Sequence, residues 1–500
     1  MRNSAKTFGK QTIPLFLLLA VSFFSLPVQA KYGGGTGESN DPYLIYTSCQ
    51  MNEIGADAND WDKHFKLMAD IDLSGYTGTE FNIIGIDYEN PFTGVFDGNG
   101  HTIFNFSFTS TGRDYIGLFG YVSDPNAEIK DLRLIDPNLD VGIAWHIGPL
   151  VGQLSGGTIA NCCVEGGSIS GLDGLGGLVG VNAGTITDCS SSAIVSGEFG
   201  VCIGGLVASN DGTITNCYSS GGVYGVSDVG GLVAFNGGTI SNCYSAASVS
   251  YIQIMGGLVG TNYGTITCCY SSGDVSGCMA IGGLVGCNEG TITNCYTATS
   301  VSGTYDMGGL AGMNHQGTII NCYSVGSVSV GNGVAGLSAY NSSHNATISN
   351  CYAPGGVSES HDIGGLVGDD SGGLYTKSFW DNTVNSSLTG IGNTTDPNVI
   401  GESTTNMQTQ STFTDARWDF VNIWDICEGT NYPKFLWQIP VGDFLCPNGV
   451  NFFDFSFFAS QWGEENCAAS NDCDGRDLDL LGSVDIKDLR IFADNWLAGL

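Results

Sequence analysis

The sequence predicts an all-β protein, a parallel β-solenoid of about ten coils with caps, followed by a small helical unit at the C-terminus. Three observations support this fold class. Residues 255–302 hold two consecutive copies of one motif, with Leu258 and Leu284 as matching positions 26 residues apart. A series of cysteines keeps the same period, and residues 441–500 hold a different duplication with a 34-residue period. Because each copy must bury its apolar face against the next, a fixed period of this length indicates stacked coils.

The leucine of each copy marks the coils. It recurs after 32, 28, 28, 26, 26, 26, 26, 27 and 29 residues, so the period loosens towards the ends, as capping coils should. Each coil has room for three short strands, whereas a propeller blade needs four strands and about 40 residues. We expect a right-handed rod about 50 Å long, at about 4.8 Å per coil. The marker residues are Leu118, Leu150, Leu178, Leu206, Leu232, Leu258, Leu284, Leu310, Leu337 and Leu366.

Within a coil the pattern is typical of short strands joined by tight corners. Residues 239–241 (Thr-Ile-Ser) alternate polar and apolar β-formers. Glycine pairs such as Gly230-Gly231 and Gly237-Gly238 mark corners where we expect unusual backbone dihedrals. In the motif Gly-Thr-Ile-x-Asn-Cys-Tyr, the isoleucine and cysteine are three residues apart, so a bend near the asparagine is needed to turn both inward. We therefore expect an asparagine ladder along that corner.

The repeat cysteines permit two interpretations. Exported proteins can form disulfides, but an identical residue in every coil also marks an interior position, where a free cysteine behaves as a small hydrophobe. We favour a buried thiol ladder. A zinc site is not expected, since the sequence shows no Cys pair or Cys/His cluster with ligand spacing. The eight cysteines are Cys162, Cys189, Cys217, Cys243, Cys269, Cys295, Cys322 and Cys351.

The N-terminus and the charge balance point to export. Basic residues precede an apolar run from Ile13 to Leu26, and small residues close it near Ala30, so we predict a signal peptide and a secreted or surface-held product. No other run approaches the roughly 18 apolar residues of a membrane span. The chain has 49 acidic and 15 basic residues, with no Lys or Arg between Arg133 and Lys377. Because neutralising phosphates requires cations, nucleic acid is excluded as a partner of the repeats.

Changes in composition divide the chain into five segments. Within the second, Trp61 to Met68 is the stretch predicted to be helical, in a cap that covers an open sheet edge. In the fourth, aromatic residues from Trp418 to Trp437 suit either a cap that closes the last coil or a sugar-binding surface, and we favour the cap. The segments are the signal peptide (1–30), the N-terminal cap and first strands (31–114), the solenoid repeats (115–370), the C-terminal cap or linker (371–440) and the helical unit (441–500).

The tail, residues 441–500, repeats itself after 34 residues. Asp443 matches Asp477 and Trp462 matches Trp496. After each loop, apolar residues recur at helical spacing, so each unit is a loop followed by an amphipathic helix, and the two units are expected to pack as a pair. One disulfide among Cys446, Cys467 and Cys473 would stabilise the weaker first half.

The second tail loop has the spacing of a calcium site. Leu481 stands at the fifth position, where a ligand is expected, and the first loop is weaker because Leu445 and Pro447 offer no side-chain ligand. The alternative is that Asp-rich turns merely cap two helices. Counting from Asp477 as position 1, Asp479 is at 3, Gly482 at 6, Ser483 at 7, Asp485 at 9 and Asp488 at 12, as in an EF-hand; Asp443, Asn451 and Asp454 remain in the first loop.

Two family resemblances rest on these motifs. The unit GGLVG…GTITNCYSSGxVSG is similar to the GLUG motif repeats of secreted and surface bacterial proteins, and DPYLIYT, FKLMADIDLSG and FDGNGHTI look like the leader that accompanies them. This resemblance implies an adhesin-like or cell-surface protein and transfers no catalytic residue. The tail resembles a type I dockerin, a calcium-binding module that docks onto cohesin domains. It implies Ca²⁺ ligands at Asp477, Asp479, Asp485 and Asp488, and partner contacts at Phe452, Phe453, Ile486 and Lys487.

The composition argues against catalysis. A polysaccharide lyase on a β-helix needs Arg or Lys, which the repeats lack beyond Arg133. A hydrolase needs two facing carboxylates, whereas Asp369 and Asp370 are adjacent and would point opposite ways on a strand. We predict a non-enzymatic exported spacer or adhesin-like surface, held to a cohesin-like partner by a calcium-dependent tail. The main alternative is a polysaccharide-binding or polysaccharide-degrading β-helix protein with its site at the aromatic caps; a third is that the tail is a degenerate anchoring signal without a cohesin partner.

Overall fold

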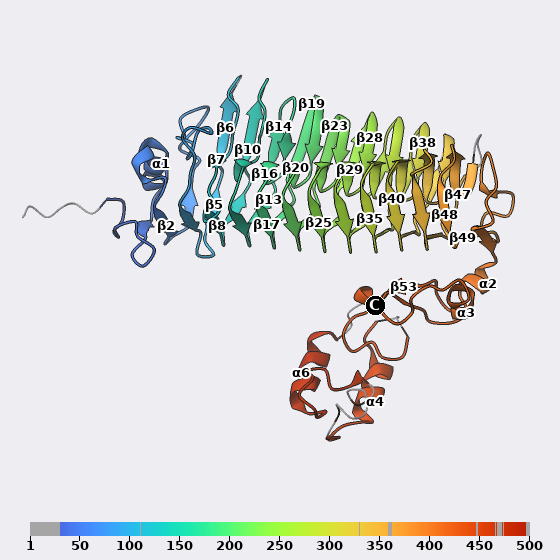
Figure 1. Ribbon diagram of the computed structural model, residues 1–500. Helices are drawn as coiled ribbons and strands as arrows, with labels where there is room; N and C mark the ends of the chain where they lie inside the picture. The colour runs from blue at the N-terminus through green and yellow to red at the C-terminus, as the bar shows by residue number, and fades with distance from the viewer. Residues whose placement is uncertain are drawn as a thin grey trace, which may run out of the picture.

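The computed structural model describes residues 31–110, 112–329, 331–358, 363–446, 449–465, 467, 473 and 475–496. The predicted signal peptide, residues 1–30, lies outside these ranges. Most of the described chain forms an elongated parallel β-solenoid, seen in Figure 1 as a stack of coils running from blue to orange. Two of its sheets contain 13 strands and the third contains 25. The predicted fold class is confirmed.

The solenoid is longer than the ten coils predicted. Strands β1 (Tyr43–Ile45), β2 (His64–Leu67) and β4 (Val95–Asp97) pair in parallel, and β4 pairs with β8 (Glu128–Lys130), so the N-terminal segment continues the same stack. At the other end, the sheet closes with β48 (Leu374–Thr376). At about 4.8 Å per strand, 13 strands span roughly 60 Å.

A central coil shows how the repeat folds. Its strands lie opposite their equivalents 26 residues before and after, so that Ile266 pairs with Ile240 on one side and Ile292 on the other. This coil therefore has five short strands, where three were expected, and three of them belong to the largest sheet. The strands are β29 (Val259–Asn262), β30 (Thr265–Thr267), β31 (Tyr270–Ser271), β32 (Val275–Ser276) and β33 (Met279–Gly282).

A residue in the left-handed region turns each coil between the two 13-stranded sheets. Asn242 has φ of 53°, a conformation that Asn and Asp adopt more readily than other non-glycine residues. The bend directs both Ile240 and Cys243 into the core, as predicted. The equivalent residues, with φ between 50° and 55°, are Asn161, Asp188, Asn216, Cys268, Asn294, Asn321 and Asn350.

The paired glycines meet a different requirement from the one predicted. Gly231 and Gly238 do not adopt positive φ, so the expectation of unusual dihedrals was wrong at these positions. A Cβ on Gly231 would lie 2.0 Å from the carbonyl oxygen of Gly257, and one on Gly238 would lie 2.1 Å from that of Gly212. Glycine is required because neighbouring coils approach too closely for any side chain.

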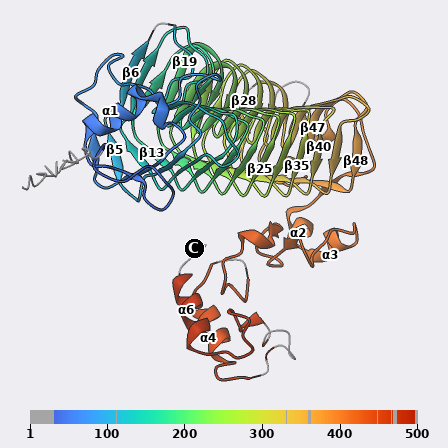
Figure 2. The ribbon, with the colours of Figure 1, turned by 60° about the vertical axis from the view of Figure 1, so that its left-hand side comes forward.

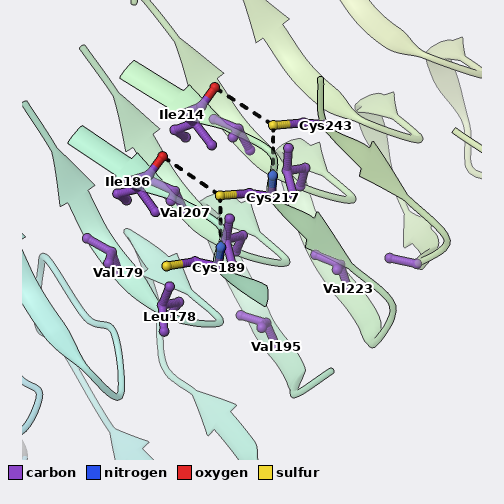
Figure 3. Packing of buried hydrophobic residues seen from close by; sticks show 14 of the residues in the cluster. Leu178, Val179, Ile186, Cys189, Val195, Val207, Ile214, Cys217, Val223 and Cys243 are labelled. Atoms are coloured by element: carbon purple, nitrogen blue, oxygen red, sulfur yellow. Dashed lines mark hydrogen bonds between the residues drawn. The ribbon is translucent and has the colours of Figure 1, made fainter. Parts of the chain in front are cut away.

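The repeat cysteines form a column inside the core. All eight are buried and none is in a disulfide, which confirms the predicted thiol ladder. In Figure 3 the N–H of Cys189 donates to Sγ of Cys217 (3.4 Å), and Sγ of Cys217 donates to the carbonyl of Ile186 (3.8 Å). Leucine, valine and isoleucine columns surround this ladder, so every coil adds the same apolar layer.

A buried asparagine ladder exists, but at another corner than the predicted one. Its amides are completely buried, and each Nδ2 donates to Oδ1 of the next asparagine at 2.7 to 2.9 Å. These residues lie four positions after the marker leucine of each coil, whereas the asparagines before cysteine form the left-handed corner, where most are at least partly exposed. The ladder consists of Asn182, Asn210, Asn236, Asn262, Asn288, Asn314 and Asn341.

A short helix lies at the N-terminal end of the solenoid (Figure 1). Helix α1 (Ser48–Ala56) buries Met51 and Ile54 and begins with a capping box between Thr47 and Gln50. The helix predicted from Trp61 to Met68 was wrong, because residues 64–67 form β2 with alternating buried side chains. The Thr-x-x-Gln capping box is the sequence signal that would have located the true helix.

The chain beyond the last coil turns back and covers one flank of the solenoid, as both ribbon views show (Figures 1 and 2). Most of its aromatic residues pack against stacked tyrosines of the coils; for example, Trp424 and Phe435 contact Tyr323. We call residues 404–438 the flank segment. It contains α2 (Thr404–Met407), α3 (Gln410–Thr414), β52 (Trp424–Asp425), β53 (Lys434–Phe435) and the 3₁₀ helix η2 (Leu436–Gln438). In the described part of the chain, no helix has both the length and the apolar character needed to span a membrane.

Candidate functional site

The two loop-and-helix units of the tail pack as the predicted pair. Helices α4 (Phe452–Ala459) and α6 (Ile486–Asp494) are related by the 34-residue shift. The equivalent rings of Phe458 and Phe492 are buried, with centroids 5.2 Å apart. The duplication therefore places both loops at the N-terminal ends of a paired set of helices.

The last carboxylate of each loop holds that loop against its helix. Oδ2 of Asp488 accepts the N–H of Asp485 (2.8 Å), and its Oδ1 accepts the N–H of Asp479 (2.9 Å). In the first loop, Oδ2 of Asp454 accepts the N–H of Asn451 (3.0 Å) in the same way. Both helices begin with a capping box formed by these residues. The backbone of the loops therefore fits both interpretations, a structural helix cap and a metal-binding loop.

The second loop brings three predicted ligands together. Asp477, Asp479 and Asp488, at loop positions 1, 3 and 12, place carboxylate oxygens within 4.8 Å of one another. Asp477 is 2 % exposed and Asp488 is completely buried. Three carboxylates this close repel one another unless a cation or protons neutralise them. A set of hard oxygen donors fits Ca²⁺ and is unsuited to zinc, which prefers nitrogen and sulfur.

The remaining predicted ligands have other contacts. Oδ1 of Asp485 accepts the N–H of Lys487 (2.8 Å) as the cap of α6, and Ser483 Oγ donates to its Oδ2 (3.4 Å). In the first loop, Oδ2 of Asp443 accepts the N–H of Gly449 (2.9 Å). That loop has Leu445 where the second has Asp479, so it offers fewer carboxylates; its Pro447 lies outside the described residues.

An exposed apolar surface adjoins these loops. Phe452, Phe453 and Ile486, in the first turns of α4 and α6, are 77 %, 75 % and 67 % exposed. Lys487, the fourth predicted contact residue, is also exposed. We call the three apolar residues the docking face. Its two parts lie at different ends of α6, because Phe452 packs against Trp496, just beyond the C-terminal end of α6, whereas Ile486 begins that helix. A hollow of about 390 Å³ between the helices adjoins Phe452; it is lined by Phe452, Phe455, Leu489, Phe492, Ala493 and Trp496.

Two disulfides fix the tail. Cys467 and Cys473 are bonded, which confirms that the tail cysteines form a disulfide among themselves. Cys446 pairs with Cys427 and so joins the first loop to the flank segment. Cys427 lies outside the duplicated tail, so the spacing of the tail cysteines gave no sign of it as a partner.

The adjacent carboxylates at the end of the repeats belong to the asparagine ladder. Nδ2 of Asn341 donates to Oη of Tyr375 (2.9 Å), and that hydroxyl donates to Oδ1 of Asp370 (2.7 Å). Burial raises the pKa of Tyr375, and the hydrogen bond to Asp370 raises it further. Asp369 accepts a hydrogen bond from Asn393. Both carboxylates thus terminate a structural network in the last coil.

Comparison with known proteins agrees with the repeat architecture. Residues 277–302 match the family model of the GLUG motif. The chain is 36 % identical to a halomucin of Haloquadratum walsbyi over 170 residues, and 35 % identical over 138 residues to an Evansella cellulosilytica protein provisionally named a Gly-rich membrane protein. These matches cover 32 % and 27 % of this chain but only 2 % and 16 % of the relatives' lengths.

A solved structure from Bacteroides ovatus, provisionally described as an immunoglobulin A1 protease, shows a weak likeness. The alignment covers 81 % of this chain and 95 % of that one, with 19 % identity and a TM-score of 0.38. A likeness at this level carries no argument about activity. The motif match and the solenoid together support a GLUG repeat protein, and the matched relatives carry the names of surface or membrane proteins.

Proposed function

We propose that this protein is an exported, non-catalytic β-solenoid that acts as a surface spacer or adhesin-like scaffold. We further propose that its dockerin-like tail attaches it to a cohesin-like partner in a calcium-dependent way. The observation that carries the proposal is the convergence of the Asp477, Asp479 and Asp488 carboxylates in the loop that leads into the first turn of α6, where Ile486 is exposed. The names of the matched relatives, a halomucin and a Gly-rich membrane protein, favour a secreted or cell-surface location.

Calcium binding and docking would be linked through α6. When bound, Ca²⁺ supplies the positive charge that the three carboxylates need. Asp488 would hold the ion and already holds the N-terminus of α6, and Ile486 of the docking face lies in the same turn. Ser483 and Asp485 would complete the ligand set at loop positions 7 and 9. Asp443, Asn451 and Asp454 would form a second, weaker site.

Two observations support a role without catalysis. Asp369 and Asp370 are hydrogen-bonded into the end of the asparagine ladder, so they do not face each other across an open site. The aromatic residues of the flank segment are largely buried against the coils, with Trp418 4 % and Trp424 1 % exposed, which disfavours a sugar-degrading site there. Release of reducing ends from a panel of polysaccharides incubated with the protein would refute this part of the proposal.

The test is calorimetric titration of Ca²⁺ into the full chain, because Cys427–Cys446 joins the tail to the flank segment. We expect saturable binding that Asp477→Asn and Asp488→Asn each weaken at least about 100-fold, since each removes a charged ligand. Asp494→Asn is the matched control, because Asp494 is an exposed carboxylate of α6 outside the cluster. Absence of binding, or equal binding by all three variants, would contradict the metal site.

A second arm tests docking. Immobilised cohesin domains should retain the protein in Ca²⁺ and release it in EDTA. The double change Phe452→Ser and Phe453→Ser should abolish retention while leaving calcium binding intact, since these side chains are exposed and are not part of the carboxylate cluster. Calcium binding without retention on any cohesin would leave the metal site standing and refute the partner.

A further inference from the structure

We propose that the N-terminal end of the stacked tyrosines is a binding site for an uncharged saccharide, with Tyr218 as its stacking platform. The tyrosines lie on the outer face of one 13-stranded sheet, and adjacent ring centroids are 4.8 to 5.0 Å apart with interplanar angles of 4° to 14°. We call this set the tyrosine column. It consists of Tyr218, Tyr244, Tyr270, Tyr296, Tyr323 and Tyr352.

The two ends of the column differ. At the C-terminal end the next residue in register is Phe379, and the flank segment covers the rings, so that Tyr323 and Tyr352 are 4 % and 1 % exposed. At the N-terminal end the next residues in register are Ser190 and then Cys163. A serine cannot cover an aromatic ring, so the stack stops with one face of Tyr218 open, and this residue is 40 % exposed.

A cavity of about 630 Å³ lies where the next rings would stand. Ser190 and Cys163 replace two successive rings of the column, Tyr218 borders the space, and the carboxylates of Glu165 and Asp188 line it together with backbone and hydroxyl groups. Its volume is within the range of about 300 to 1,000 Å³ typical of small-ligand sites. The space therefore combines one aromatic face with several polar groups.

These groups match the two kinds of surface on a sugar ring. The C–H groups on one face of a pyranose carry partial positive charge and are attracted to the negative face of an aromatic ring. Its hydroxyls would donate to carboxylates, and such charge-assisted hydrogen bonds are stronger than neutral ones. Asp188 is already oriented, because its Oδ1 accepts from Asn216 Nδ2 (3.1 Å) and its Oδ2 from Thr187 Oγ1 (2.9 Å).

The charges select an uncharged ligand. Glu165 and Asp188 would repel an anionic sugar, as would the net charge of −34 on the chain. A cation meets less attraction than two carboxylates suggest, since Arg133 forms an ion pair with Glu165. A neutral saccharide would hydrogen-bond through its hydroxyls and stack on the Tyr218 ring. It is not repelled by the carboxylates, and it does not compete with the ion pair of Arg133 and Glu165.

The test is affinity electrophoresis of the full-length protein through gels containing a soluble cellulose derivative, galactomannan or dextran. EDTA is present throughout, so that calcium-dependent docking has no influence on the result. We expect at least one polysaccharide to retard the protein. Tyr218→Ala should weaken retardation about tenfold or more, whereas Tyr218→Phe, which keeps the ring, should stay within about twofold.

The sharper variant is Ser190→Tyr, which extends the column by one ring and fills the cavity. We expect it to abolish retardation. Its thermal midpoint should equal or exceed that of the unmodified protein, because six successive coils already carry tyrosine at this position. A loss of binding with an unchanged midpoint therefore reports on the site and excludes unfolding.

Three results would overturn the proposal. One is the absence of retardation by all three polysaccharides. Another is equal retardation of the unmodified protein and Ser190→Tyr. The third is equal retardation of the unmodified protein and Tyr218→Ala, since binding would then not depend on the ring.

Discussion

The solenoid and the tail use cysteine in opposite ways. In the coils eight cysteines stay reduced and stack in the core, whereas Cys427, Cys446, Cys467 and Cys473 form two disulfides in and beside the tail. The solenoid core is one continuous cluster, while the described core of the tail contains six buried residues. Where repetition supplies apolar burial, cysteine adds a small hydrophobe; where burial is scarce, it adds a covalent constraint.

The largest effect should come from a side chain placed between coils. In Gly257→Ala the new Cβ would lie 2.1 Å from the carbonyl oxygen of Gly283, so the coils must separate and lose hydrogen bonds. We expect the free energy of unfolding to fall by more than about 4 kcal/mol, measured by urea unfolding with circular dichroism. Gly75→Ala is the control, since no atom lies within 4 Å of that Cβ.

Equal stability of the two alanine variants would show that close approach of the coils does not require glycine. The comparison isolates the contact, because both substitutions add one methyl group to a residue without positive φ.

The second effect should be confined to the tail. Replacing Cys427 and Cys446 with alanine removes a bond that closes 19 residues, which should lower the stability of the tail by about 3 kcal/mol. Hydrogen exchange read by mass spectrometry should show faster exchange in α4 and α6 and no change in the coils. Cys49→Ala, which removes an exposed free thiol, should change neither region. Faster exchange in the coils as well would mean that the two regions unfold together.

The smallest effect should appear at alkaline pH in the solenoid. Burial raises the pKa of Cys269 well above its ordinary value of 9.0. Above pH 9 the unfolded chain loses this proton while the folded chain keeps it, so stability is unaffected below pH 9 and falls above it. The slope is about 1.4 kcal/mol per pH unit for one thiol.

Urea unfolding between pH 8 and 11 measures this slope. Cys269→Ala should reduce it by the contribution of one thiol, whereas Cys278→Ala should not, because Cys278 is exposed. An unchanged slope in Cys269→Ala would show that the buried thiol titrates no differently from one in the unfolded chain.

The repeat made the solenoid predictable. Because coils stack in register, a residue that recurs every 26 positions must lie above itself, so the leucine and cysteine columns could be placed in the core from spacing alone. Spacing does not say which corner an asparagine occupies. Most of the repeat coils have asparagine at two positions with the same period; one adopts the left-handed conformation, and the other is buried in the ladder.

Segments without a repeat were harder to predict. The alternation of Phe65 and Leu67 is too short to distinguish a strand from a helix, and no repeat period marks this stretch as part of a coil. In the tail, EF-hand spacing included the three carboxylates that converge, Asp477, Asp479 and Asp488, but it also included Asp485, which caps α6. The pairing of Cys427 with Cys446 depends on how the flank segment packs on the coils, which no local pattern encodes.

The fixed register between coils has a consequence for how this protein can change its length. Val259 lies opposite Val233 on one side and Val285 on the other, so each central coil presents the same surfaces to both neighbours. Duplication or deletion of a 26-residue unit would join equivalent positions and leave both ends untouched. The length of the rod can therefore change in steps of about 4.8 Å, one for each coil added or removed, while α1 and the tail keep their distance from the nearest coil.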